Sequence, residues 1–176
     1  MNQALHATLA GLLEKPAVTF QNFSVTALFG EALAEPDYLT LDEALAEGVA
    51  RVTEVSQSGS VPELRFENAA SRPVLLLDGE ELVGAKQNRV LNVSILVPAK
   101  TTITVPVSCV EAGRWDYRSA EFGSENRAYF AEGRMQKMMQ VTASLKQGGT
   151  RRSDQSAVWD AIASNAERLQ VHSDTA

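Results

Sequence analysis

Cysteine and histidine are nearly missing from this sequence of 176 residues. The single cysteine, Cys109, cannot form an intrachain disulfide, so the composition does not indicate an oxidising compartment. The two histidines, His6 and His172, lie near opposite ends of the chain. This supply excludes a metal site built from histidine and cysteine, and a carboxylate-bound divalent ion has no supporting motif. We therefore expect no metal and no resident cofactor.

An excess of positive charge and long apolar runs are also missing. The chain has 16 Lys and Arg against 22 Asp and Glu, a net charge of -6. No basic stripe is available to neutralise phosphates, so neither nucleic acid nor an anionic membrane surface is an expected partner. No run approaches the roughly 20 apolar residues that span a membrane, and the start of the chain lacks the basic region of a signal peptide. We expect a cytoplasmic protein.

The remaining composition is that of a globular protein, 44% hydrophobic and 22% charged. Its length predicts a single domain over residues 1–176. Strand patterns dominate residues 17–115, and helical patterns dominate residues 123–171. We therefore predict an α+β fold in which an antiparallel β sandwich or barrel-like core is followed by two C-terminal helices.

The first third of the chain contains the clearest helix signals. Leucines at helical spacing in the first twenty residues predict a short amphipathic helix that Pro16 ends, followed by a strand. Thr40 and Glu43 form a capping-box pattern, which predicts a helix that ends at Gly48 and leads into a strand over 49–55. The composition of residues 56–62 favours a loop.

Residues 62–111 read as strands throughout, and the pair Asp78-Gly79 between apolar runs is a strong hairpin signal. After Trp115 the pattern becomes helical. Ser124 is the expected N-cap of one helix, Gly148-Gly149 its end, and a second helix should cover residues 153–169. We expect Met135, Met138 and Met139 to be core residues of the first helix, and the last five residues of the chain to fray.

The segment "LDGEELVGAKQNRVLNVSIL", residues 77–96, combines an unbroken polar block with an apolar strand. Read with a period of two, the apolar face of residues 91–97 continues backwards to Arg89 and Gln87. The apolar face of the next strand, residues 103–107, continues forwards to Cys109 and Glu111. If both faces point to one core, these four polar side chains lie at one end of it.

A hairpin through residues 98–100 would make this arrangement specific. Only registers whose paired residue numbers have an even sum bring the two apolar faces together, because a slip of one residue reverses every side chain. One such register sets Arg89 opposite Cys109, and another sets it opposite Glu111. In both, Gln87 lies one step further out, and the cluster should form the polar floor of a pocket that opens onto a concavity.

Each of these residues also has a structural interpretation. An Arg89–Glu111 pair could simply fix the register of a sheet margin. A lone cysteine on an apolar strand face is more often a core residue than a nucleophile. Of the two carboxylates that follow the turn, Glu80 should be solvated. Glu81 is the better candidate for a raised pKa and acid–base chemistry, although a surface carboxylate is the simpler reading.

The stretch from Leu77 to Trp115, with "GEEL", "KQNR" and "PVSC" followed by "GRW", resembles a bacterial domain family. That family is named for its association with ADP-ribosylglycohydrolases and with rhodanese/phosphatase-superfamily proteins. The resemblance implies a role in the metabolism of NAD and ADP-ribose derivatives, without an established reaction. The positions that match the family's prominent polar residues are Glu81, Gln87, Asn88, Arg89, Asn92, Ser108, Cys109, Glu111, Arg114 and Trp115.

Three functions follow as hypotheses. In an enzyme acting on a nucleotide-like molecule, Arg89 would bind a phosphate or carboxylate, and Glu81, Glu111 or Cys109 would carry the chemistry. The amides of Gln87, Asn88 and Asn92, together with Arg114 and Trp115, would bind and orient the ligand. In a non-catalytic accessory module, the same pocket would only bind. In a structural or interaction domain, the polar cluster would only hold the sheet together. The oligomeric state is left open.

Overall fold

The structure is a computed structural model. It describes residues 3–30, 36–56, 62–148 and 150–172. The loop expected at 57–61 and most of the end expected to fray lie outside these ranges. The chain divides into two compact units, Met1–Pro36 and Asp37–Ala176, which are described separately. The expectation of a single domain stays a prediction.

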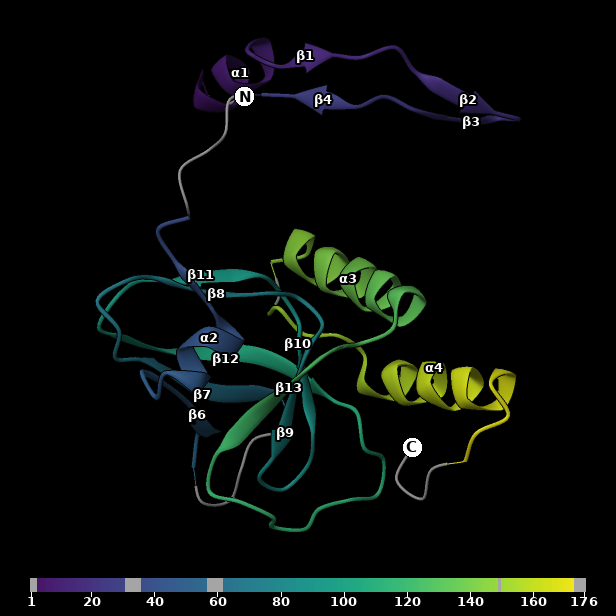
Figure 1. Cartoon of the computed structure of the whole chain (residues 1–176). Helices are drawn as coiled ribbons and strands as arrows, with labels where there is room; N and C mark the ends of the chain where they lie inside the picture. The colour runs from purple at the N-terminus through teal and green to yellow at the C-terminus, as the bar shows by residue number, and fades with distance from the viewer. Residues whose placement is uncertain (1–2, 31–35, 57–61, 149, 173–176) are drawn as a thin grey trace. The chain divides into compact units, whose positions relative to one another are not determined.

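The first unit contains one short helix and one long hairpin (Figure 1). Helix α1 covers Gln3–Ala10. It therefore ends before Leu12 and Leu13, which were expected to complete its apolar stripe. The hairpin consists of two paired segments. In one, β1 (Leu13–Glu14) pairs with β4 (Leu28–Phe29), and in the other, β2 (Val18–Phe20) pairs with β3 (Phe23–Val25). The expected strand is therefore both arms of a hairpin.

The second unit is built around a closed barrel whose neighbouring strands are all antiparallel. In order around the barrel, its strands are β10 (Arg89–Leu91), β12 (Thr101–Cys109), β7 (Glu63–Asn68), β6 (Ala50–Glu54), β13 (Phe122–Ala128) and β9 (Glu80–Gly84). A small sheet contains β11 (Ile95–Val97), β8 (Val74–Leu76) and β5 (Leu39–Thr40). With two C-terminal helices following, the predicted α+β class and barrel-like core are confirmed.

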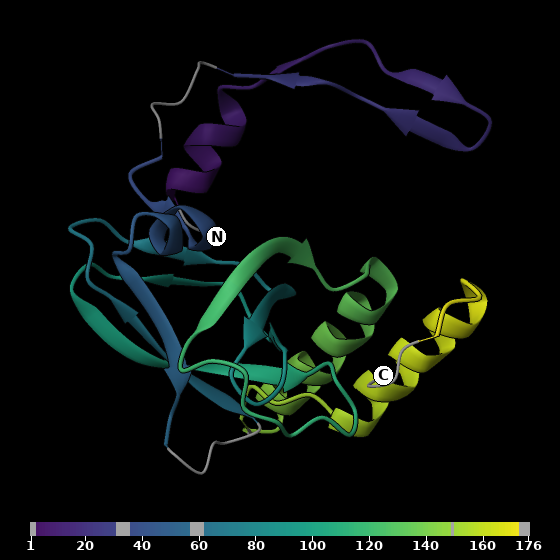
Figure 2. The ribbon, with the colours of Figure 1, turned by 60° about the horizontal axis from the view of Figure 1, so that its bottom comes forward.

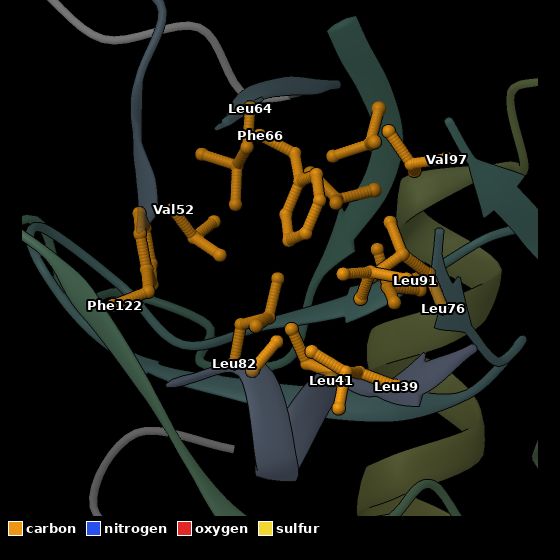
Figure 3. Packing of buried hydrophobic residues seen from close by; sticks show 14 of the residues in the cluster. Leu39, Leu41, Val52, Leu64, Phe66, Leu76, Leu82, Leu91, Val97 and Phe122 are labelled. Atoms are coloured by element: carbon orange, nitrogen blue, oxygen red, sulfur yellow. The ribbon is translucent and has the colours of Figure 1, made fainter. Parts of the chain in front are cut away.

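The barrel interior is filled by alternate residues of its strands, as a period of two requires. Leu64 and Phe66 on β7 are 0% and 1% exposed, and they pack with Val52 of β6 and Leu82 of β9 (Figure 3). Burial of each such side chain contributes about 1.5–3 kcal/mol. Leu41, the first residue of helix α2 (Leu41–Ala46), joins the same core, so this helix and the barrel share one hydrophobic interior.

Helix α2 begins as predicted. The Thr40 hydroxyl accepts a hydrogen bond from the Glu43 amide, and the Glu43 carboxylate accepts one from the Thr40 amide at 2.7 Å. This reciprocal capping box satisfies two amides that the helix itself leaves unpaired. Gly48 follows the helix with a φ of 68°, a left-handed conformation that glycine adopts without strain.

Helices α3 (Ala131–Lys146) and α4 (Gln155–Arg168) lie on the same side of the barrel (Figures 1 and 2). The expected start of α3 at Ser124 is wrong, because strand β13 continues to Ala128 to complete the barrel. The expected methionine core is also wrong. Met135, Met138 and Met139 are 54%, 52% and 65% exposed.

The buried face of α3 contains a lysine in place of the expected apolar stripe. Its buried residues are Gly133, Lys137 and Val141. A Cβ atom at Gly133 would lie 2.6 Å from the Tyr129 ring, so glycine permits the helix to pack closely there. A second small core of Val90, Tyr129 and Val158 joins the barrel to helix α4 and to the segment that leads into α3.

The hairpin predicted at Asp78-Gly79 does not form, although the turn does, with Gly79 at a φ of 83°. The strand before it, β8, pairs with β11 and β5, whereas the strand after it, β9, pairs with β10 and β13. The turn therefore carries the chain from the small sheet into the barrel. Contacts distant in sequence outweigh the local turn preference, since the Asp78 amide donates to Ser94 Oγ at 3.0 Å.

The hairpin predicted through residues 98–100 is also wrong, because β11 and β12 are not paired with each other. The apolar run 89–97 splits at Asn92, because β10 stays in the barrel and β11 pairs with β8 in the small sheet. Asn68 ties the two sheets together at this corner. Its side-chain amide donates to the carbonyls of Arg72, Val97 and Pro98, and its oxygen accepts from the Ala70 amide.

None of the helices among the described residues is long and apolar enough to cross a membrane.

Candidate functional site

The predicted register is present where the chemistry requires it, between β10 and β12. Arg89 lies opposite Cys109, and Leu91 lies opposite Val107, so the paired residue numbers have the even sum that was expected. Arg89, Leu91, Val107 and Cys109 therefore share the face that points into the barrel. One end of an apolar barrel interior consequently contains a guanidinium and a thiol.

We call Gln87, Arg89, Cys109 and Glu54 the barrel-end cluster. Arg89 Nη1 donates to Gln87 Oε1 at 2.9 Å and to Cys109 Sγ at 3.1 Å, and the thiol donates to the same Gln87 oxygen at 2.7 Å. Arg89 Nη2 lies 3.9 Å from Glu54 Oε1 across the barrel. Arg89 and Cys109 are 0% exposed, so the expected opening of this cluster onto a concavity is wrong for these two residues.

The barrel-end cluster is incompletely hydrogen-bonded. Among the described residues, both carboxylate oxygens of Glu54 and the Nε and Nη2 atoms of Arg89 are buried without a hydrogen-bond partner. Most buried polar atoms in proteins have a partner, and each unmatched one costs about 1–3 kcal/mol. Glu54 therefore has acceptor atoms, and Arg89 has donor atoms, that no described residue satisfies by a hydrogen bond.

Glu54 was missed by the sequence reasoning. It lies on β6, 35 positions before Arg89, and reaches the cluster because β6 closes the barrel. A signal was present, since alternation places Glu54 on the same face as the buried Val52. A carboxylate on the buried face of a strand is uncommon, and this position could have been considered together with the polar block.

Cys109 has the environment of a core thiol. Burial raises its pKa above the ordinary value, although the Arg89 guanidinium acts in the opposite direction. The thiolate is the nucleophilic form of cysteine, so this thiol is poorly suited to attack a substrate.

A second network lies beside the cluster and holds Glu111 in place. The Glu111 carboxylate accepts from the Asn88 amide at 2.6 Å and from Arg114 Nε at 2.6 Å, and it forms an ion pair with Arg114 Nη2. Arg114 also donates to Asn88 Oδ1 at 3.1 Å. Glu111 does reach Gln87, as the register predicted, but through its backbone carbonyl, which accepts from Gln87 Nε2 at 2.9 Å.

The electrostatics of Glu111 are those of a fixed anion. Burial acts to raise its pKa, but the hydrogen bonds from Arg114 and from the Asn88 amide outweigh burial and hold the pKa below the ordinary value. A general acid needs the opposite shift. Glu111 is therefore arranged to order the loop after β12.

Glu80 and Glu81 point in different directions, as alternation required. Glu81 accepts from Asn88 Nδ2 at 3.2 Å and lies 3.5 Å from Arg127 Nε. Glu80 was expected to be solvated, but it is partly buried and accepts from the Leu77 amide at 2.8 Å. Burial raises the pKa of Glu80, and the Leu77 hydrogen bond offsets part of this effect.

The Trp115 ring lies close to both Arg89 and Lys86. Its ring is 5.7 Å from Arg89 Cζ and 5.2 Å from Lys86 Nζ, both within cation–π range, and its side chain is 48% exposed. A cavity of about 310 Å³ adjoins this region. The residues that line it include Glu54, Lys86 and Tyr117. Glu54 thus lines the cavity and also lies 3.9 Å from Arg89.

Asn92 and Ser108, by contrast, lie on the helix side of β10 and β12. Ser108 Oγ donates to Asn92 Oδ1 at 2.7 Å and lies 2.6 Å from Ser153 Oγ. Gln155 adds two hydrogen bonds to the backbone of Cys109. These contacts attach the start of α4 to the barrel, and the structure does not bring Asn92 into the barrel-end cluster.

A match to a protein-family model covers residues 13–176, nearly the whole chain. The model describes ARPP-1, the ARG and Rhodanese-Phosphatase-superfamily-associated Protein domain. The chain belongs to the ARPP-1 family. The predicted resemblance is therefore confirmed. Neither the search of curated proteins nor the search of solved structures found a match.

The ARPP-1 match includes every residue of the barrel-end cluster and of the Glu111 network. The family description names an association with other proteins and does not assign a reaction. Among the described residues, no group of three or more His, Cys, Asp or Glu side chains could hold a metal ion.

Proposed function

We propose that the barrel end binds a small NAD- or ADP-ribose-derived nucleotide without transforming it. The observation that carries the proposal is the set of unmatched buried atoms on Glu54 and Arg89, next to a cavity of about 310 Å³. A buried charge pair at 3.9 Å with free hydrogen-bonding positions is poorly satisfied by itself. A ligand with both donors and an anionic group would satisfy it.

The chemistry of the two groups fits a ribose phosphate. A carboxylate accepts hydrogen bonds from ribose hydroxyls, as acidic residues do in dinucleotide-binding proteins. A guanidinium presents several donors in the geometry that phosphate and carboxylate oxygens accept. Glu54, which lines the cavity, would meet the sugar. Arg89 is 0% exposed, so binding of the anionic group to Arg89 would require the Glu54 side chain to move aside.

The surroundings support an aromatic and anionic ligand. Trp115 offers a half-exposed ring on which a base could stack, and Lys86 lies on the same ring and on the cavity wall. The cavity is at the lower end of the range of about 300–1,000 Å³ that is usual for ligand sites. It therefore suits one ribosyl or base moiety, with the rest of the nucleotide in solvent.

Binding without catalysis is the reading that the local electrostatics favour. The pKa of Cys109 is raised by burial, and the pKa of Glu111 is lowered by its hydrogen bonds. Neither shift suits the role of nucleophile or general acid. Glu81 shares its carboxylate between Asn88 and Arg127, which favours a structural role.

Thermal unfolding in the presence of ADP-ribose, NAD, ribose 5-phosphate and nicotinamide tests the proposal. A ligand present at 100 times its Kd stabilises the protein by about 2.7 kcal/mol. We expect at least one ribose phosphate to raise the melting temperature of the wild type and of the control Glu63→Gln, a surface substitution on β7. The Glu54→Gln protein should lose the response.

Two results would contradict the proposal. One is the absence of a shift with every ligand, and the other is a Glu54→Gln protein that responds as the wild type does. The same mixtures, analysed chromatographically after incubation, would reveal turnover. Turnover that is lost in Glu81→Gln or Glu111→Gln would favour the enzyme hypothesis over binding alone.

A further inference from the structure

The tip of the N-terminal hairpin has one apolar face and one polar face. Val18 pairs with Val25 and Phe20 pairs with Phe23, and alternation places these four side chains on the same face. We call them the apolar ribbon face. The opposite face carries Thr19 and Ser24, whose hydroxyl groups are hydrogen-bonded at 2.7 Å.

Within the described residues of the first unit, nothing covers the apolar ribbon face. Val18 and Phe20 are 75% and 74% exposed, and Phe23 and Val25 are 67% and 53% exposed. A two-stranded hairpin is marginally stable at best by itself. Alternation of apolar and polar residues is typical of strands with one buried and one solvated face. We therefore expect a partner to cover the apolar ribbon face.

We propose that the apolar ribbon face forms a homodimer interface by packing against the same face of a second copy of the chain. Two such ribbons stacked about a two-fold axis would form a small sandwich. Their apolar side chains would interdigitate between the layers, and the Thr19–Ser24 faces would remain in water.

The available apolar area is that of a weak, concentration-dependent dimer. Phe20 and Phe23 are 74% and 67% exposed, and at about 200 Å² per side chain they present on the order of 300 Å². With Val18 and Val25, the apolar ribbon face reaches on the order of 400 Å² per chain. This is about half of the roughly 800 Å² that each partner contributes to an interface of standard size, and it falls in the range of weak interfaces.

A second copy also fits the charge of the ribbon. Between residues 12 and 30, Glu14 and Lys15 are the only charged side chains, and they lie at the base of the hairpin. The apolar ribbon face itself carries no charge, so packing it against its own copy would bury no ion and bring no like charges together. A polyanionic or strongly basic partner would find nothing complementary there.

The mass of the intact chain in solution, measured by sedimentation equilibrium across a wide range of concentration, tests this proposal. We expect the wild type to approach twice the mass of one chain as concentration rises. The double variant Phe20→Thr/Phe23→Thr should remain at the mass of one chain. The matched control Met139→Thr, an equally exposed apolar residue on α3, should dimerise as the wild type does.

Several outcomes would overturn the proposal. These are a wild type that remains monomeric, a double variant that still dimerises, or a Met139→Thr protein that does not. A monomer whose ribbon amides resist hydrogen exchange would show that the face docks on its own chain, and binding of the monomer to neutral lipid vesicles would show a membrane partner. Unchanged melting of the double variant verifies that the barrel is intact. The nucleotide proposal is tested separately, because no residue of the barrel-end cluster is altered.

Discussion

Replacement of Asp78 by asparagine should leave the buried ammonium of Lys137, on helix α3, without its anionic partner. The Lys137 ammonium is 0% exposed and donates to Asp78 Oδ1 at 2.5 Å and to the Leu91 carbonyl at 2.6 Å. Asparagine has the shape of aspartate but not its charge. The substitution therefore leaves the ammonium buried with two neutral acceptors.

The expected loss of stability is large for a single isosteric change. Removing one partner of a buried pair costs about 3–5 kcal/mol, whereas replacing both by apolar groups is often close to neutral. Asp78→Asn should therefore lower the free energy of unfolding by about 3–5 kcal/mol near neutral pH. The double variant Asp78→Asn/Lys137→Met should recover most of that loss.

The pH dependence of the free energy of unfolding is an independent test of the Asp78–Lys137 pair. Burial lowers the pKa of Lys137 in the native protein, and its hydrogen bond to Asp78 only partly offsets this effect. The unfolded chain then binds more protons than the native protein between that lowered pKa and the ordinary lysine pKa, so the free energy of unfolding rises with pH in this window. In Asp78→Asn the rise should begin at lower pH.

Urea denaturation of the single and double variants, followed by circular dichroism at several pH values, measures both quantities. The second cation beside Asp78 is Arg134, whose Nε lies 3.3 Å from Asp78 Oδ2, and every variant retains it. A loss below about 1 kcal/mol in Asp78→Asn would refute the reasoning, since such a loss is typical of an exposed pair. So would a double variant less stable than the single one.

Three further predictions follow from the shifted pKa values. Because burial raises the pKa of Cys109, a thiol reagent should label it slowly at neutral pH and rapidly only in denaturant; fast native labelling would contradict this. Glu111→Gln should lower the free energy of unfolding by about 1.5–3 kcal/mol near neutral pH. The native pKa of Glu111 is lowered, so its contribution is present above the ordinary carboxyl pKa and disappears as pH falls through the native pKa; urea titrations should show the two proteins converging in acid. Burial raises the pKa of Tyr129 to about 12, and ultraviolet titration of the Tyr129→Phe protein should lack the phenolate that ionises there in the wild type.

Strand alternation was the part of the sequence that could be interpreted reliably. Arg89 opposite Cys109 follows from the requirement that Leu91 and Val107 face one core, and that requirement is local to each strand. The capping box at Thr40 was readable for the same reason, because all of its partners lie within four residues.

The choice of partner strand could not be read from the sequence. The run 89–97 is uniform in pattern, yet its two halves join different sheets, and Asn68 holds the corner through carbonyls about thirty residues away. Glu54 was missed for a related reason. Closure of the barrel brings Glu54 on β6 to within 3.9 Å of Arg89, the first residue of β10, although the two strands are not neighbours in the sheet. The local pattern after Ser124 predicts a helix. Residues up to Ala128 are instead part of strand β13, because closure of the barrel outweighs the local preference of that segment.

Fluorescence of Trp115 tests the central claim most directly, because its ring lies 5.7 Å from Arg89 Cζ and 5.2 Å from Nζ of Lys86, a residue that lines the cavity. The chain has two tryptophans, so a Trp159→Phe protein reports on Trp115 alone. Titration of that protein with ADP-ribose should change the emission in a saturable way, and the added substitution Glu54→Gln should abolish the change. An emission that is unaffected by ADP-ribose, or that responds equally with Glu54→Gln, would contradict binding at the barrel end.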